Sequence, residues 1–139
     1  MANMPKEVLD LVKDQGLPKI VATVDKDGVP NVTLKTSLMA PDDKTLAFAD
    51  LYGRKTRTFK NLEKTKKVSV LVFKVPIAPP FPAYQIKGSF IEYLTSGPIF
   101  DQFAKAIKDA MKMDIAGVGT IKVDAVYSQA PQDAGKQIS

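Results

Sequence analysis

The sequence predicts an α+β domain in which six mostly antiparallel strands form a small, closed or nearly closed barrel with short flanking helices. Three observations lead to this fold class. Apolar, β-branched segments are joined by hairpin-type turns, and the helical segments are inserted among them rather than alternating with them. Barrel closure would also protect the edges of so many apolar strands. The length of 139 residues is that of one domain, residues 1–139.

The first half of the chain is expected to contain one helix, three strands and the start of a second helix. Residues 5–14 have the pattern of a short amphipathic helix, which Gly16 ends. The sequence Asp-Lys-Asp-Gly at 25–28 is a strong hairpin signal. The basic segment that follows the third strand reads as a helix, with Phe59 and Leu62 facing inward. The expected strands of this half are residues 20–24, 29–39 and 45–49.

The second half begins with a strand at 68–75, which is apolar enough to be buried on both faces. Residues 76–82 hold four of the ten prolines and therefore form an ordered loop. The aromatic residues around this loop fit core packing or a subunit contact better than a substrate lid. A long strand follows at 83–94, in which Gly88 is a candidate for a bulge or bend.

A second amphipathic helix starts at Pro98, and a last strand covers about 118–127. The apolar side chains of the helix fit the core or an interface and are Phe100, Phe103, Ile107, Ala110 and Met111. Alternation in the strand predicts one common face for Ile121, Val123, Ala125 and Tyr127. The tail from Gln129 is polar and is expected to be frayed, so that residues 129–139 form a loose end.

Composition excludes several kinds of chemistry. Without Cys the chain has no disulfide, thiol nucleophile or thiolate metal site, and without His it has no Ser-His-Asp triad and no usual zinc or haem ligand. No catalytic residue and no metal site is predicted. An organic cofactor would have to supply redox chemistry. No apolar run approaches a membrane-spanning length of about 20 residues, and no secretory signal is visible, so we expect a cytoplasmic protein.

The basic residues are concentrated in one segment. Seven of the 20 Lys and Arg lie between Arg54 and Lys67 with a single acid, so this segment carries +6 while the rest of the chain sums to −1. The segment starts where a strand leads into a helix, and the N-terminus of a helix favours anions. Three interpretations are open: a phosphate site, an ordinary solvated helix face, and a nucleic-acid surface. The last is weakened because Phe59, the aromatic residue of the segment, looks inward.

Several motifs resemble one known family. They are Gly53-Arg54-Lys55-Thr56, then Asn61-Leu62 and Val68-Ser69-Val70, followed by Ile86-Lys87-Gly88-Ser89 and Gly97-Pro98-Ile99-Phe100. In this order and spacing, from about Val8 to Ser128, the chain resembles the pyridoxamine 5′-phosphate oxidase-related split β-barrel flavoproteins, especially their small single-domain FMN-binding members. The resemblance implies a homodimer with FMN at the subunit interface, and an electron-transfer protein or small flavin-dependent oxidoreductase.

The resemblance also implies three groups of cofactor-binding residues. The phosphate would be bound at Gly53, Arg54, Lys55 and Thr56; the ring and ribityl chain would lie along Thr33, Leu34, Lys35, Thr36 and Ser37, and against Ala49, Asp50 and Leu51. Other interpretations stay open for some of them. Asp50 fits a loop cap as well as a cofactor contact, Lys35 fits a solvent-exposed side chain, and the hydroxyls of the second strand fit a half-exposed surface.

The chain departs from the oxidase proper at two places. Thr33 stands where that enzyme has an Arg, and its C-terminal, Arg- and Trp-bearing substrate segment has no counterpart before Ser139. True pyridoxamine-phosphate oxidase activity is therefore not expected, and the redox partner or substrate is open. The alternative functions are the same fold binding the deazaflavin F420 and a nucleic-acid-binding barrel that uses residues 54–67.

Overall fold

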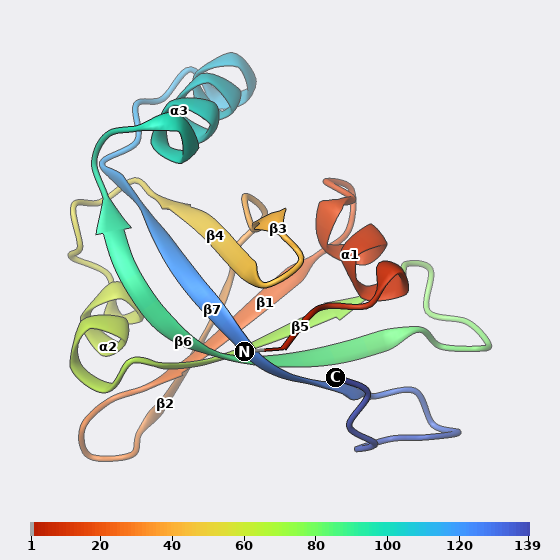
Figure 1. Cartoon of the computed structure of the whole chain (residues 1–139). Coiled ribbons are helices and arrows are strands. Elements are labelled where there is room, and N and C mark those ends of the chain that lie inside the picture. The colour runs from red at the N-terminus through yellow and green to blue at the C-terminus, as the bar shows by residue number, and fades with distance from the viewer. Residues whose placement is uncertain (1) are drawn as a thin grey trace.

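Seven antiparallel strands form one sheet that curls into a partly open barrel, and three helices flank it (Figure 1). This computed structural model describes residues 2–139. The helices are α1 (Lys6–Lys13), α2 (Arg57–Thr65) and α3 (Pro98–Met111), and the strands are β1 (Lys19–Val24), β2 (Pro30–Leu34), β3 (Met39–Asp42), β4 (Thr45–Asp50), β5 (Lys67–Phe73), β6 (Ala83–Leu94) and β7 (Gly117–Ser128). The strand order is β2-β1-β5-β6-β7-β4-β3, so β2 and β3 are the two edges. The predicted α+β barrel class is confirmed.

The predicted number of six strands is wrong, because the expected strand 29–39 is two strands. β2 pairs with β1 and ends at Leu34, whereas β3 pairs with β4 at the opposite edge of the sheet. Between them the chain turns: the Lys35 N–H donates to the carbonyl of Lys19 (2.9 Å), and the Leu38 N–H donates to the carbonyl of Lys35 (3.1 Å). The Leu38 side chain is fully buried and anchors the turn to the core.

Two β-bulges bend the long strands β6 and β7, and one of them lies at the predicted position, Gly88. The register slips between Lys87 and Gly88, which leaves Asp124 as an extra residue on β7. The predicted common face of β7 is therefore wrong beyond Val123: the buried positions continue at Val126 instead of Ala125. Because a bulge adds one residue, it moves every later side chain to the other face.

The prediction that β5 is buried on both faces is wrong for its outer face. Val68, Val70 and Val72 are buried, but the alternate residues Leu71 and Phe73 are half-buried on the outer face. β5 thus has one core face and one accessible apolar face in this chain.

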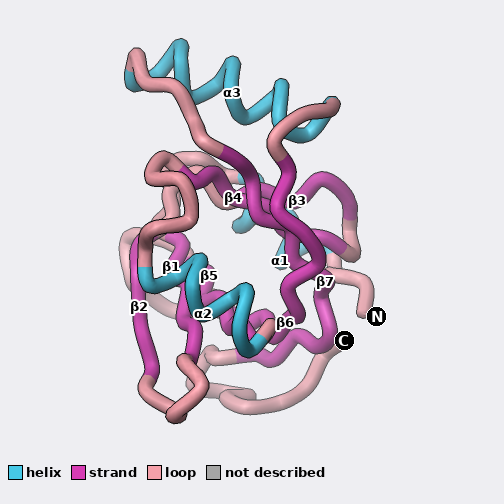
Figure 2. The backbone as a smooth tube through the Cα atoms, turned by 90° about the vertical axis from the view of Figure 1, so that its left-hand side faces the viewer, coloured by secondary structure: helices cyan, strands magenta, loops and turns pink. Residues whose placement is uncertain are grey.

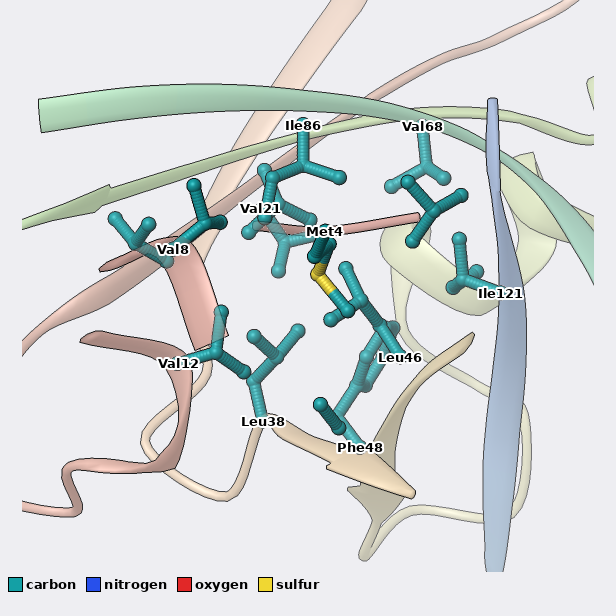
Figure 3. Packing of buried hydrophobic residues seen from close by; sticks show 14 of the residues in the cluster. Met4, Val8, Val12, Val21, Leu38, Leu46, Phe48, Val68, Ile86 and Ile121 are labelled. Carbon is teal, nitrogen blue, oxygen red and sulfur yellow. The ribbon is translucent and has the colours of Figure 1, made fainter. Parts of the chain in front are cut away.

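Helices α1 and α2 lie at opposite ends of the barrel, and both reach its core (Figure 2). Val8 and Val12 of α1 and Phe59 and Leu62 of α2 are fully buried, as expected for their apolar faces. They pack in one cluster with the inward side chains of the strands (Figure 3). The other members with less than 10% exposure are Met4, Val21, Leu38, Ala40, Leu46, Phe48, Val68, Val70, Val72, Ile86, Ile121, Val123 and Val126.

The segment after β7 is ordered by backbone hydrogen bonds, so the predicted frayed tail is wrong. Ser128 N–H donates to the carbonyl of Lys136 (2.8 Å), and Val126 N–H donates to that of Ser139 (2.9 Å). The N-terminal segment joins the same region through the Ala2 N–H and the carbonyl of Val123 (3.0 Å). Both ends of the chain are consequently held against β7 (Figure 1). Within residues 2–139, no helix has the length and apolar character needed to cross a membrane.

A substitution at Gly88 tests how the barrel bends. A Cβ at this position would lie 2.5 Å from Ile121 Cγ2 and 2.7 Å from the backbone oxygen of Lys122. Gly88→Ala is expected to lower the free energy of unfolding by about 1–3 kcal/mol, the usual cost of overpacking. Urea denaturation measures it, with Gly16→Ala as the control, because a Cβ there meets only one side-chain oxygen of Asp14, at 3.3 Å. Equal stabilities of the two variants would contradict the close-approach explanation.

Candidate functional site

The basic segment begins in a tight turn between β4 and α2 that is organised by a buried carboxylate. Asp50, the last residue of β4, is fully buried. Its Oδ1 accepts from the Tyr52 N–H (3.0 Å), and its Oδ2 accepts from the Arg54 N–H (2.6 Å). The turn places Gly53 at φ 64° and Arg54 at φ 68°, both in the left-handed region. For a residue other than glycine this conformation costs about 1 kcal/mol, so Asp50 is the group that offsets it.

A third hydrogen bond to Asp50 comes from Tyr93 of β6, whose hydroxyl donates to Oδ2 at 2.7 Å. The ring of the same tyrosine lies under the guanidinium of Arg54, with 4.1 Å from Cζ to the ring centroid. Burial, together with the Asp50 carboxylate, raises the pKa of the Tyr93 hydroxyl well above its usual range. The tyrosine therefore stays a hydrogen-bond donor. Sequence reasoning missed this residue, which lies 43 positions from Asp50 and carries no local signal.

The turn leads into the N-terminus of α2. Thr56 is the N-cap residue, and its Oγ1 accepts from the Phe59 N–H at 3.4 Å. The first turn of a helix has backbone N–H groups without intrahelical acceptors, and these groups favour an anion. Lys55 and Arg57 are exposed beside it, and Arg54 makes only a loose contact with Glu63, 3.6 Å from Nε to Oε1. The loop can thus present three cations and several N–H donors to a negatively charged group.

The turn between β2 and β3 lies next to the end of β4. Ser37 Oγ accepts from the Ala49 N–H at 3.1 Å, which ties the two segments together. The amino group of Lys35 points toward the aromatic cluster, with Nζ 5.6 Å from the centroid of Phe48 and 5.8 Å from that of Phe59. Burial lowers the pKa of the Lys35 ammonium, and the nearby Asp50 carboxylate opposes this effect only in part.

A largely apolar groove of about 670 Å³ separates α3 from the β2–β3 turn and β3. Thr36 and Ser37 form one edge of it. The remaining lining residues are Met39, Ala40 and Pro41 of β3, Gln102, Phe103, Ala106, Ile107, Ala110 and Met111 of α3, Lys13 at the end of α1, and Gln15 just after it. The apolar stripe of α3, predicted as core or interface, is therefore divided: Phe103 is buried, but Met111 is 51% exposed and faces the groove.

The structure brings most of the sequence-predicted residues to one end of the barrel. Gly53, Arg54, Lys55 and Thr56 form the loop before α2, whereas Ala49, Asp50 and Leu51 lead into it. Lys35, Thr36 and Ser37 form the neighbouring turn.

Thr33 and Leu34, both predicted to contact the cofactor, lie on opposite faces of β2. Thr33 lies opposite the buried Val21, so it belongs to the inner face of β2. Leu34 belongs to the outer face and is 58% exposed. Asn31, which was not predicted, connects the inner face of β2 to α2 because its Nδ2 donates to Thr58 Oγ1 at 3.2 Å. Cofactor contact by each of these residues stays a prediction.

Comparisons with known proteins agree with this architecture. An uncharacterized protein of Methanocaldococcus jannaschii is 32% identical over 124 residues, which cover 86% of this chain and 78% of that protein. HupZ of Group A Streptococcus has a TM-score of 0.79 and 24% identity, covering 98% of this chain and 99% of HupZ. An FMN-binding protein of Syntrophomonas wolfei subsp. wolfei also has a TM-score of 0.79 and is 17% identical. The similarity covers 88% of this chain and 84% of that chain. At these identities the two structures show the shared fold.

The fold accommodates more than one cofactor. Besides the FMN-binding protein, it occurs in an F420 reductase and in HutZ, the haem storage protein of Vibrio cholerae. Residues 4–135 match the family described as pyridoxamine 5′-phosphate oxidase, which covers nearly the whole chain. The strand order, the loop before α2 and this match lead to one conclusion: the chain belongs to the pyridoxamine 5′-phosphate oxidase family of split β-barrel proteins.

Proposed function

We propose that this protein binds FMN and acts in electron transfer or as a small flavin-dependent oxidoreductase. The observation that carries the proposal is the position of the β4–α2 loop. Its cations Arg54 and Lys55 and the N-terminus of α2 lie at the same end of β4 as the Ser37 edge of the apolar groove. A phosphate group and a largely apolar ring system thus have adjacent, chemically matched surfaces.

The residues present fit such a cofactor. An arginine provides a planar, bidentate donor for phosphate, a lysine provides a point charge, and the helix N-terminus provides backbone donors. The groove of about 670 Å³ lies within the usual size range of small-molecule sites and combines apolar walls with a few polar groups. The family of this chain includes proteins with this kind of cofactor.

Bound flavin would supply hydride or single-electron transfer, and the residues of this chain would bind and orient it. Arg54, Lys55 and Thr56 would hold the phosphate. Thr36 and Ser37 would offer hydroxyl groups to the polar edge of the ring; Ser37 Oγ already accepts from Ala49, which leaves its O–H to donate. Lys35 would add a positive charge close to Phe48 and the end of β4.

F420 is the second candidate, because the cations on α2 extend beyond the loop. Arg57, Lys60 and Lys64 are exposed, which is more positive charge than one phosphate requires. A cofactor with additional carboxylates, as F420 has, would use them. Haem is less favoured, since the 139 residues contain neither His nor Cys, its commonest protein ligands. Nucleic acid is also less favoured, because Phe59 is fully buried and cannot stack on a base.

We further propose that two copies of the chain pair through the outer face of β2, β1 and β5. Leu34, Ile20 and Leu71 are direct cross-strand neighbours on this face. Val32, the next outward residue of β2, is 66% exposed. In the loop that follows β5, Ile77 is also exposed, at 72%. Contiguous exposed apolar surface of this kind is typical of protein interfaces.

The phosphate role is tested by the double variant Arg54→Ala/Lys55→Ala, titrated with FMN and with riboflavin. Riboflavin lacks the phosphate, so its affinity should change little, whereas the affinity for FMN should fall about 100-fold for the loss of two charged contacts. Quenching of flavin fluorescence measures both. Lys64→Ala/Lys67→Ala is the matched control, because it removes the same charge from the far end of α2 and the start of β5.

The control should weaken FMN binding no more than about threefold, since exposed charges more than about 10 Å away are largely screened. An equal loss of FMN and riboflavin affinity in Arg54→Ala/Lys55→Ala would contradict a phosphate site at the loop. If the control variant lowered the FMN affinity equally, the effect of the loop residues would be general electrostatic attraction and not a specific phosphate site.

The dimer is tested by Val32→Glu, which places a charge on the β2 part of the outer face, at an exposed apolar residue. Sedimentation equilibrium should give a dimer for the wild type and a monomer for the variant, because an unpaired buried charge costs several kcal/mol. Ile91→Glu is the control, an exposed apolar residue (48%) in the β6 bulge, outside the proposed face. A wild type that sediments as a monomer would rule out the pairing.

A further inference from the structure

Tyr93 makes two different contacts at the candidate phosphate loop, one with Asp50 and one with Arg54. Its hydroxyl donates to Asp50 Oδ2, the oxygen that also accepts from the backbone N–H of Arg54. Its ring lies under the guanidinium of Arg54, at 4.1 Å. One tyrosine therefore restrains both the backbone and the side chain of this arginine.

The position of the ring is itself determined by the barrel. On one side, Gly117 of β7 leaves room for it: a Cβ there would lie 2.3 Å from Tyr93 Cζ. On the other side, Phe59 of α2 meets it edge to face, with 5.5 Å between the ring centroids and an angle of 89°. Tyr93 thus has little freedom to move, and its outer face is left for Arg54.

The restraint matters because Arg54 has few other fixed partners. The backbone of this residue is in the left-handed region, at φ 68°. Its contact with Glu63 is long, 3.6 Å, and both side chains are at least 40% exposed. Without the tyrosine, an exposed arginine side chain would sample many rotamers and would lose that freedom when it bound an anion.

We propose that Tyr93 is the positioning residue for phosphate recognition: it holds Arg54 and the Asp50-bound turn in the arrangement that distinguishes a phosphate monoester from its unphosphorylated analogue. This inference rests on the proposed flavin site, and it adds to it a residue from β6 that would not touch the cofactor. Preorganisation raises affinity by reducing the ordering that binding requires. Loss of Tyr93 should therefore lower the affinity for FMN and leave the affinity for riboflavin nearly unchanged, so that the ratio of the two affinities falls.

The experiment separates the two contacts. Tyr93→Phe keeps the ring and removes the hydrogen bond to Asp50, whereas Tyr93→Leu removes both. The ratio of the riboflavin to the FMN dissociation constant should fall about fivefold in Tyr93→Phe, the net effect of losing one hydrogen bond of ordinary strength. In Tyr93→Leu it should fall as far as in Arg54→Ala, and Tyr93→Leu/Arg54→Ala should show no further fall, because the tyrosine acts through the arginine.

Tyr84→Phe and Tyr84→Leu are the matched controls, since Tyr84 is a half-buried tyrosine of the same strand. They should leave the ratio unchanged. Retained riboflavin binding reports that each variant is folded. If the ratio is unchanged in Tyr93→Leu, whether both affinities are retained or fall equally, the positioning role is overturned. Tyr93 then contributes only to packing.

A second measurement keeps this inference separate from the flavin proposal. The Nε–H resonance of Arg54 should be shifted by the ring current of Tyr93, and it should move when inorganic phosphate is added. If the wild type binds neither flavin but this resonance responds to phosphate, and the response is lost in Tyr93→Leu, then FMN is the wrong ligand and the role of Tyr93 is supported. If the wild type binds neither flavin and the resonance does not respond to phosphate, both proposals fail.

Discussion

The arrangement of the candidate site depends on one buried carboxylate. Asp50 is fully buried at the end of β4 and accepts hydrogen bonds from two backbone N–H groups and one tyrosine hydroxyl. A carboxylate removed from water without partners would cost several kcal/mol, so these three donors are what makes its burial possible. The same donors define the turn: they bring Arg54 back toward β4 and aim the start of α2 outward. The buried carboxylate of Asp50 thereby fixes the turn that exposes the cations of the loop on the protein surface.

The barrel supplies the rigid frame for this turn. β4 pairs with β7, and β7 pairs with β6, so Asp50 and Tyr93 come from strands separated by only one neighbour. Bulges in β6 and β7 set the curvature, and Gly117 provides the space for the tyrosine ring. The break between β2 and β3 has a related effect, because it brings Ser37 to the N–H of Ala49. As a result, the Ser37 edge of the groove lies beside the end of β4 that leads into the loop before α2.

The parts that could be predicted from sequence are local. Arg54, Lys55 and Thr56 are consecutive, and the turn and helix start around them have recognisable residues. Three other features depend on pairing across the sheet. No glycine or proline marks the turn at Lys35, which forms because β2 and β3 pair with different neighbours. The change of face after Val123 follows from the bulge opposite Gly88. Tyr93 reaches Asp50 only after β6, β7 and β4 have paired, so neither composition nor alternation could indicate it.

The most direct test of the account is the identity of the small molecule that the protein carries. The purified, desalted protein would be examined by visible absorption, and the molecule released by heating would be identified by mass spectrometry. The account predicts the spectrum of an oxidised flavin and the mass of FMN. A haem spectrum, or a colourless protein that fails to quench the fluorescence of added FMN, would contradict it.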